Sequence, residues 1–174
     1  MVISNYGVLL QRLTLDKIEM IRNWRNDAKI SQYMEFKEYI TPEMQKKWFD
    51  KINNDDNYYF IIQVDNKEVG LINIKDIDYN IKEGEAGIFI YDDEYLNSEV
   101  AFKAVFVLFD YCFYKLKLEK IKAHILKTNK RAVKYNMSLG YKIVDSNDIN
   151  ENQLYSLKLD DYLEKRNKLL KFLN

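Results

Sequence analysis

The fold of this chain is decided by one stretch, residues 121–144, which reads IKAHILKTNKRAVKYNMSLGYKIV. The apolar residues at 121–126 predict a β-strand. Residues 129–139 have the apolar spacing of a helix, and Gly140 stands just past it, where a glycine is a favoured helix terminator. A short strand is expected to follow at 141–144. This strand–helix–strand order is typical of a mixed α/β domain.

Hydrophobic periodicity predicts the remaining elements in the same way. Further strands are expected at 8–13, 58–64, 69–74, 85–91 and 154–159. Helices are expected from Thr14 or Asp16 to about Arg25, and at 41–52, 100–116 and 160–173. The helix at 41–52 begins with Thr41 as its N-cap and Pro42 in its first turn.

Three details of packing follow from this order of elements. The dipeptide Asp65-Asn66 joins two strands as an antiparallel hairpin. The helix at 100–116 is apolar almost all round, which predicts burial against a sheet. The two preceding helices are expected to bury stripes made of Leu15, Ile18, Ile21 and Trp24, and of Met44, Trp48, Phe49 and Ile52. The chain is therefore predicted to be a single α/β domain over 1–174, with a mixed, mostly antiparallel central sheet flanked by helices.

Composition narrows the classes of function. The 27 basic and 27 acidic side chains cancel, and the lysines are interleaved with acids, so a nucleic-acid-binding surface is not expected. An apolar run of about 20 residues and a secretory signal are both missing from the sequence, which predicts a cytoplasmic protein without a membrane span. The lone Cys112 is expected to be a buried free thiol. Neither Glu85 nor His124 has metal-ligand partners at a useful spacing, so no metal site is expected.

Four local stretches resemble parts of GCN5-related N-acetyltransferases. Residues 85–90, EAGIFI, resemble the E-I-G-I-x-I strand of that family, and residues 129–141 resemble its N-x-x-A-x-x-x-x-x-x-L-G-F/Y segment. The stretches WRND at 24–27 and ITPEMQKKWF at 40–49 are similar to the subgroup that includes amino-sugar and ribosomal-protein acetyltransferases. The resemblance extends from about Val8 to Leu159. It implies a V-shaped splay between the strand that ends at Ile90 and the strand at 121–126.

The resemblance also implies a site for acetyl-CoA between those two strands. Backbone groups around Phe89 and Ile90 would bind the pantetheine amides, and Asn129 would help fix the pantetheine arm. The pyrophosphate would lie on backbone N–H groups at the start of the 100–116 helix, where the helix dipole favours an anion. That segment contains Asn97, Ser98, Glu99, Val100 and Ala101.

The pyrophosphate loop departs from the family's pattern. Where relatives read R/Q-x-x-G-x-G/A, residues 96–101 read LNSEVA, and only the small Ala101 is kept. Glycines let the backbone approach a diphosphate closely, whereas Glu99 adds bulk and a negative charge. In the alternative interpretation Asn97 or Ser98 caps an ordinary helix, whose dipole Glu99 complements. Both interpretations stay open.

The catalytic residues that the resemblance implies are a base and an acid. Glu85 is the preferred base, although a solvent-facing strand glutamate is the alternative. Many relatives carry a tyrosine acid seven residues after the asparagine, but here Asn136 has that position and Tyr135 lies about 100° around the helix. Asn136, Tyr135 or water could then assist the departing thiolate. His124 titrates near neutral pH beside the cleft, but a lone strand histidine is commonly structural.

The implied reaction is direct attack by a primary amine of a small molecule on acetyl-CoA. Trp24, Arg25 and Asn26 are predicted to bind the acceptor, for which an amino-sugar nucleotide is the preferred interpretation. Alternatively, Trp24 belongs to the core and Arg25 caps its helix. Two other functions stay open: acetylation of a protein N-terminus, and a non-catalytic binding role with the altered loop. The apolar helix at 160–173 could form a homodimer or pack on its own sheet.

Overall fold

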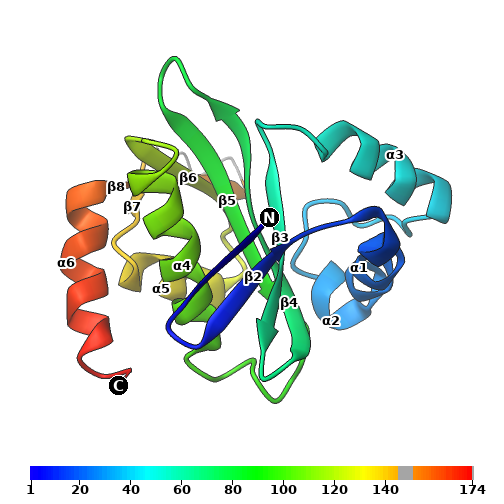
Figure 1. Ribbon diagram of the computed structural model, residues 1–174, viewed down its shortest axis with the longest axis horizontal. Helices are drawn as coiled ribbons and strands as arrows, with labels where there is room; N and C mark the ends of the chain where they lie inside the picture. Colours follow the sequence, from blue (N-terminus) through cyan, green and yellow to red (C-terminus); the bar gives the residue numbers. More distant parts are fainter. Residues whose placement is uncertain (145–150, 174) are drawn as a thin grey trace.

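The computed structural model describes residues 1–144 and 151–173, built around one large sheet (Figure 1). Within those residues the sheet has eight strands in the order β1-β2-β3-β4-β5-β6-β8-β7. Every neighbouring pair is antiparallel except β5 and β6, which run parallel. The strands are β1 (Val2–Asn5), β2 (Val8–Arg12), β3 (Tyr58–Val64), β4 (Lys67–Asp78), β5 (Glu83–Ile90), β6 (Lys120–Leu126), β7 (Lys142–Ile143) and β8 (Asn152–Lys158).

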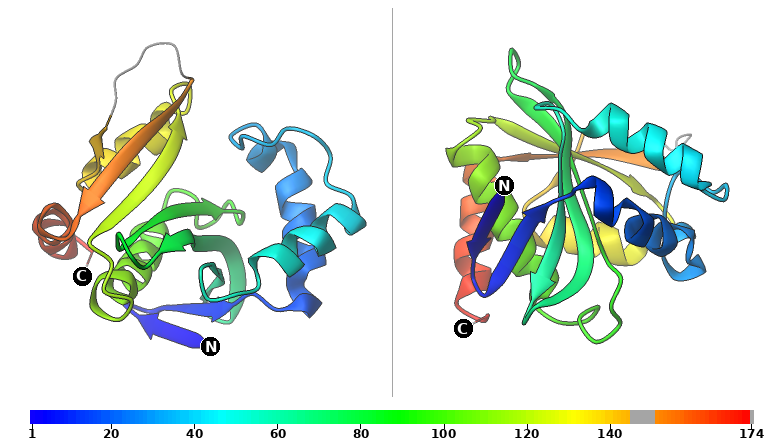
Figure 2. Two further views of the ribbon diagram at one scale, coloured as in Figure 1. Left: turned by 90° about the horizontal axis from the view of Figure 1, so that it is seen from above. Right: turned by 45° about the vertical axis from the view of Figure 1, so that its right-hand side comes forward.

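Helices cover both faces of this sheet and form two apolar clusters. They are the short 3-10 helix η1 (Leu15–Lys17), α1 (Ile18–Asn26), α2 (Ala28–Ser31), α3 (Pro42–Ile52), α4 (Val100–Tyr114), α5 (Lys130–Ser138) and α6 (Leu159–Leu170). The larger cluster joins α4 and α6 to one face through buried aromatic rings such as Phe106 and Tyr162. The smaller one joins α1 and α3 to the other face through Ile21, Trp24 and Phe49. Figure 2 shows α1–α3 gathered on one side of the molecule and α6 on the other.

The sheet splits between β5 and β6, which confirms the predicted V-shaped splay. The two strands pair only from Glu83 to Glu85, opposite Lys120 to Lys122. Beyond that point β5 continues to pair with β4 as far as Ile90, while β6 continues to pair with β8. Figure 2 shows β6 and β8 turning away from β4 and β5. The mixed α/β class and the mostly antiparallel sheet are therefore confirmed.

Local chemistry explains the elements that were predicted well. Asp65 and Asn66 both have left-handed φ values, 49° and 63°, which suit the tight turn of the β3–β4 hairpin. The Thr41 hydroxyl accepts a hydrogen bond from the Met44 amide at 3.2 Å, which confirms it as the N-cap of α3. Cys112 is fully buried, as expected. The terminal helix packs on its own chain, where Tyr162 is inaccessible to solvent.

Several boundaries and packing details were predicted wrongly. β1 and α2 were missed, because each has only four residues and neither shows a clear period. Thr14 makes no side-chain cap, and Leu15, placed in the buried stripe of the first helix, is 52% exposed. Met44 was expected in the core but is 36% exposed; Gln45 is fully buried instead. The buried face of α3 runs through Gln45, Phe49 and Ile52, at i, i+4 and i+7 spacing.

None of the helices in the described residues is long and apolar enough to cross a membrane. Nor do these residues contain a cluster of three or more His, Cys, Asp or Glu side chains that could hold a metal ion.

Candidate active site

A cleft of about 520 Å³ opens where β5 and β6 separate. One wall is residues 85–90 of β5 and another is residues 123–126 of β6. Helix α5 contributes a third wall with Ala132, Tyr135 and Asn136, and Ala101 adds the start of α4. The mouth is bordered by residues 32–35, which follow α2. The splay of the sheet therefore creates the cleft, because β5 has no strand partner on that side beyond Glu85 within the described residues.

Two titratable side chains meet at this divergence of the strands. Glu85 and Lys122 are register partners in the parallel pair, so His124, two residues further along β6, lies on the same face as Glu85. The imidazole Nδ1 of His124 is 2.8 Å from Oε2 of Glu85, and both side chains line the cleft. Glu85 and His124 were each named from the sequence, but their contact was not predicted. Aligning the two strands as a parallel pair would have predicted it.

Lys75 of β4 completes this cluster. Its ammonium Nζ is 3.2 Å from Oε1 of Glu85, so the two carboxylate oxygens have different partners. Burial lowers the pKa of Lys75, but the adjacent carboxylates of Glu85 and Asp76 together outweigh this effect, and the pKa lies above its ordinary value. Lys75 is therefore a firmly charged partner that fixes the position of the Glu85 carboxylate.

The segment before α4 is held by its own side chains. The Ser98 hydroxyl accepts a hydrogen bond from the Val100 amide at 3.2 Å and donates one to the Tyr95 carbonyl at 2.7 Å. Glu99 forms an ion pair with Lys103, one turn further along α4. The amides of Ala101 and Phe102 make no hydrogen bond within the described residues, so they can receive an anion.

Helix α5 closes the other side of the cleft. The Asn129 side chain caps the helix by accepting a hydrogen bond from the Ala132 amide at 3.0 Å. The Tyr135 hydroxyl donates to the Ala101 carbonyl at 2.9 Å, and burial raises the pKa of this hydroxyl. Asn136 donates to the Ala132 carbonyl at 2.9 Å. Tyr135 thus ties α5 to the start of α4.

Trp24 and Arg25, which were predicted to bind the acceptor, lie outside the cleft. Trp24 is 7% exposed and stacks on Tyr91 with ring centroids 5.0 Å apart, as the core interpretation predicted. The Arg25 guanidinium lies over the Trp48 ring at 5.0 Å and donates to Gln45 Oε1 at 3.3 Å. Burial lowers the pKa of Arg25. Neither side chain lines the cleft.

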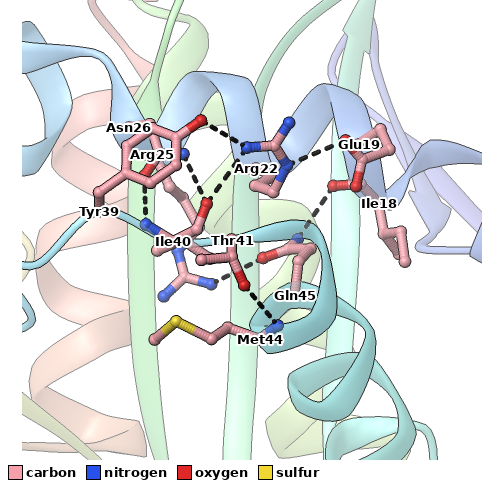
Figure 3. A network of polar contacts seen from close by, with 10 residues as sticks. All are labelled: Ile18, Glu19, Arg22, Arg25, Asn26, Tyr39, Ile40, Thr41, Met44 and Gln45. Carbon is pink, nitrogen blue, oxygen red and sulfur yellow. Dashed lines mark hydrogen bonds and ion pairs between the residues drawn. The ribbon is translucent and has the colours of Figure 1, made fainter.

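Asn26 fixes the 32–40 loop, the segment between α2 and the N-cap of α3. Its side-chain amide donates to the Ile40 carbonyl at 2.9 Å, and its Oδ1 accepts from the Ile40 amide at 2.8 Å. Arg22 donates to the same carbonyl at 3.2 Å and to the Tyr39 hydroxyl at 3.1 Å (Figure 3). Asn26 does not line the cleft; it anchors the loop whose residues 32–35 do. No motif in the sequence marked residues 32–39 of this loop.

A family model described as an acetyltransferase (GNAT) domain matches residues 8–142. This chain belongs to the GNAT acetyltransferase family. It is an acetyl-CoA-dependent N-acetyltransferase, with acetyl-CoA as its co-substrate. The interpretation of the altered loop as a mark of a non-catalytic protein is accordingly set aside.

Curated and solved relatives agree with this family. The acetyltransferase PseH of Campylobacter jejuni is 28% identical over 134 residues, which cover 76% of this chain and 82% of PseH. The spermidine N(1)-acetyltransferase of Escherichia coli K12 is 24% identical over 141 residues, covering 80% and 75%. Among solved structures, apo FdhC, described as a nucleotide-linked sugar GNAT, has a TM-score of 0.81 at 20% identity, covering 100% of this chain and 99% of FdhC. The spermidine N-acetyltransferase of Vibrio cholerae in complex with CoA and spermine has a TM-score of 0.75 at 21% identity, covering 91% and 99%. These structural likenesses establish the GNAT fold.

The GNAT cleft of this chain suits acetyl-CoA in two respects. On the side that faces β6, the β5 backbone at Phe89 and Ile90 has no strand partner in the described part of the chain. Backbone groups on that side can therefore bind the pantetheine arm. The Ala101 and Phe102 amides at the start of α4 have no hydrogen-bond partner in the described residues and are open to an anion. Of the residues predicted to hold the cofactor, four line the cleft: Phe89, Ile90, Ala101 and Asn129. The others do not: Asn97, Ser98, Glu99 and Val100.

Proposed function

We propose that this GNAT enzyme transfers the acetyl group of acetyl-CoA to the primary amine of an amino-sugar nucleotide. The observation that carries the proposal is the charge of the cleft. Three carboxylates line it within the described residues: Glu35, Glu85 and Asp93. Asp93 is paired with Lys29 at 3.2 Å, and Glu85 with Lys75 at 3.2 Å, which leaves Glu35 as the one lining carboxylate without a cation partner in that set.

A cleft with one uncompensated carboxylate favours an acceptor with a single amine. A polyamine carries several ammonium groups and is best bound by several uncompensated carboxylates. A basic peptide N-terminus would likewise need an acidic groove. An amino-sugar nucleotide presents one amine, and its other groups are hydroxyls, phosphates and a flat base. The similarity to PseH and to the nucleotide-linked sugar GNAT supports the same choice.

The 32–40 loop offers a surface for the flat base. Tyr33 lines the mouth of the cleft and is 55% exposed, so its ring is available for stacking. Stacking of a base on an aromatic ring contributes about 1–3 kcal/mol. Trp24, Arg25 and Asn26 then support acceptor binding from behind, by packing against β5 and by anchoring this loop.

The roles in the reaction follow from these positions. Acetyl-CoA supplies the activated acetyl group. The amine must lose a proton before or during attack, and Glu85 and His124 face the cleft where that proton is released. Asn136 and Tyr135 lie on the α5 wall, where they could assist the departing thiol as predicted; since Tyr135 already donates to Ala101, it would have to exchange that bond to do so.

The proposal is tested by release of CoA thiol with a panel of acceptors. The panel contains a nucleoside-diphosphate-linked amino sugar, the free amino sugar, spermidine and a basic peptide. Cys112 is buried, so it contributes little background to a thiol reagent. The expected result is the highest kcat/KM with the sugar nucleotide. A higher kcat/KM with spermidine or with the peptide would overturn the assignment.

A pair of tyrosine variants tests how the base is recognised. Tyr33→Ala is expected to raise KM for the sugar nucleotide about tenfold, since 1.4 kcal/mol corresponds to a factor of ten. The same variant should leave KM for the free amino sugar unchanged. Tyr114→Ala is the matched control, because Tyr114 is 45% exposed at the end of α4 and does not line the cleft. Equal effects of Tyr33→Ala on both sugars would show that Tyr33 does not bind the base.

A further inference from the structure

We infer that His124 is the base that removes the amine proton, and that Glu85 is a positioning residue which orients the imidazole. The inference rests on the acetyl transfer proposed above, but not on which amine receives the acetyl group. It reverses the expectation that Glu85 acts as the base and His124 is structural.

Hydrogen bonding fixes the proton on one imidazole nitrogen. The Nδ1 atom of His124 is 2.8 Å from Oε2 of Glu85. An ionised carboxylate only accepts hydrogen bonds, so Nδ1 carries the proton and donates it. In the neutral ring, Nε2 then holds a lone pair. Nε2 makes no hydrogen bond within the described residues, so this lone pair is available in the cleft.

Exposure and pairing distinguish the two side chains. Glu85 is 22% exposed, and its two oxygens are taken by Lys75 and His124. The His124 side chain is 42% exposed, and its Nε2 has no partner in the described residues. The residues before and after it, Ala123 and Ile125, are buried members of the larger apolar cluster, which fixes this stretch of β6. His124 is therefore fixed by a packed strand, and the Glu85 carboxylate that orients it is held in turn by Lys75.

The proton and the bonds balance with this division of roles. The amine nitrogen forms a bond to the acetyl carbon while its proton passes to Nε2 of His124. The bond between that carbon and the CoA sulfur breaks, and the sulfur keeps the electron pair. The Glu85 carboxylate stabilises the imidazolium during this step. His124 then returns its proton to water, since the ring is partly exposed.

The tautomer can be measured without any substrate. His124 is the only histidine of the chain, so a long-range ¹H–¹⁵N spectrum reports one imidazole ring. The expected result is the tautomer with the proton on Nδ1 in the natural protein. Glu85→Ala should restore the Nε2-protonated form that free histidine favours. An Nε2-protonated ring in the natural protein would overturn the inference, and this readout holds even if none of the tested amines is acetylated.

Kinetics test the role itself, with whichever amine the panel shows to be the best acceptor. His124→Gln is expected to lower kcat by about 10²-fold or more, with KM for acetyl-CoA unchanged. Glu85→Gln should lower kcat less, and the double variant should be no worse than His124→Gln alone, because the two residues act as one unit. Lys122→Gln is the matched control, since it changes a side chain on the same face of β6 that does not line the cleft and whose partner is Glu83, not Glu85. A larger loss in Glu85→Gln than in His124→Gln would return the role of base to Glu85 and refute the inference.

Discussion

Asn26→Ala tests how the acceptor side of the cleft is held together. The Asn26 side chain makes two hydrogen bonds to the backbone of Ile40, at 2.8 and 2.9 Å. These bonds close the 32–40 loop, whose first four residues border the cleft. The variant removes both bonds. The Ile40 carbonyl keeps its bond from Arg22, whereas the Ile40 amide loses its partner.

The expected loss of stability follows from this count. Each hydrogen bond contributes about 1 kcal/mol net, and a part-buried amide left unpaired costs about 1 kcal/mol more. The free energy of unfolding should therefore fall by about 2–3 kcal/mol, which corresponds to about 5–10 °C in Tm for a chain of this size. Because the proposed acceptor site lies beside this loop, KM for the acceptor should rise about tenfold while KM for acetyl-CoA stays the same.

Asn23→Ala is the matched control for this experiment. Asn23 lies one turn earlier on α1, and its side chain is exposed. The same substitution there should change the free energy of unfolding by less than about 0.5 kcal/mol. Urea denaturation and initial rates at varied concentrations of each substrate measure both effects. The account of the loop is refuted if Asn26→Ala is as stable as Asn23→Ala, or if it weakens acetyl-CoA instead of the acceptor.

Three further predictions concern other parts of the molecule. Gly140 has φ +103°, and an added Cβ would lie 2.8 Å from the Asp161 carbonyl oxygen, so Gly140→Ala should lower the free energy of unfolding by about 2–4 kcal/mol in urea denaturation. Hydrogen bonds from Lys120 and then Lys122 lower the pKa of Glu83, so its contribution to stability is present above its ordinary pKa of 4.5 and is lost as pH falls through the lowered value. Thermal melts from about pH 6 to about pH 3 should accordingly show a flatter profile for Glu83→Gln than for the natural protein. The Cys112 thiol, whose pKa is raised by burial, should react with a thiol reagent only after denaturant is added.

The sequence predicted those parts of the fold that depend on local chemistry. Asp65-Asn66 can form a tight turn by themselves, Thr41 and Pro42 start α3 by themselves, and the apolar run at 100–116 requires burial wherever it lies. In the buried stripe of α3, Phe49 and Ile52 were predicted correctly, but Met44 was assigned in place of Gln45 because Gln45 is polar. The buried Gln45 side chain donates to the Ile18 carbonyl of α1 at 3.0 Å, a contact between helices that periodicity cannot reveal.

The candidate site was predictable only in part, for the same reason. The motif at 85–90 located Glu85, but its contact with His124 depends on the parallel register between β5 and β6. The motif around Asn26 marked a residue near the acceptor side, but its partner is the backbone of Ile40, fourteen residues away, across a loop without periodicity. In both cases the residue is visible in the sequence, while its role depends on a neighbour that only the fold supplies.

The most direct test of the account is calorimetric titration of acetyl-CoA into the purified protein, alongside Glu99→Gly. The Glu99 carboxylate is paired with Lys103, and the open Ala101 and Phe102 amides remain for the diphosphate, so the altered loop should still bind. The account predicts a micromolar Kd for the natural protein, about −8 kcal/mol, and a similar value for Glu99→Gly. Binding by Glu99→Gly with none by the natural protein would contradict it, because the cleft between β5 and β6 would then be closed to the co-substrate that the reaction needs.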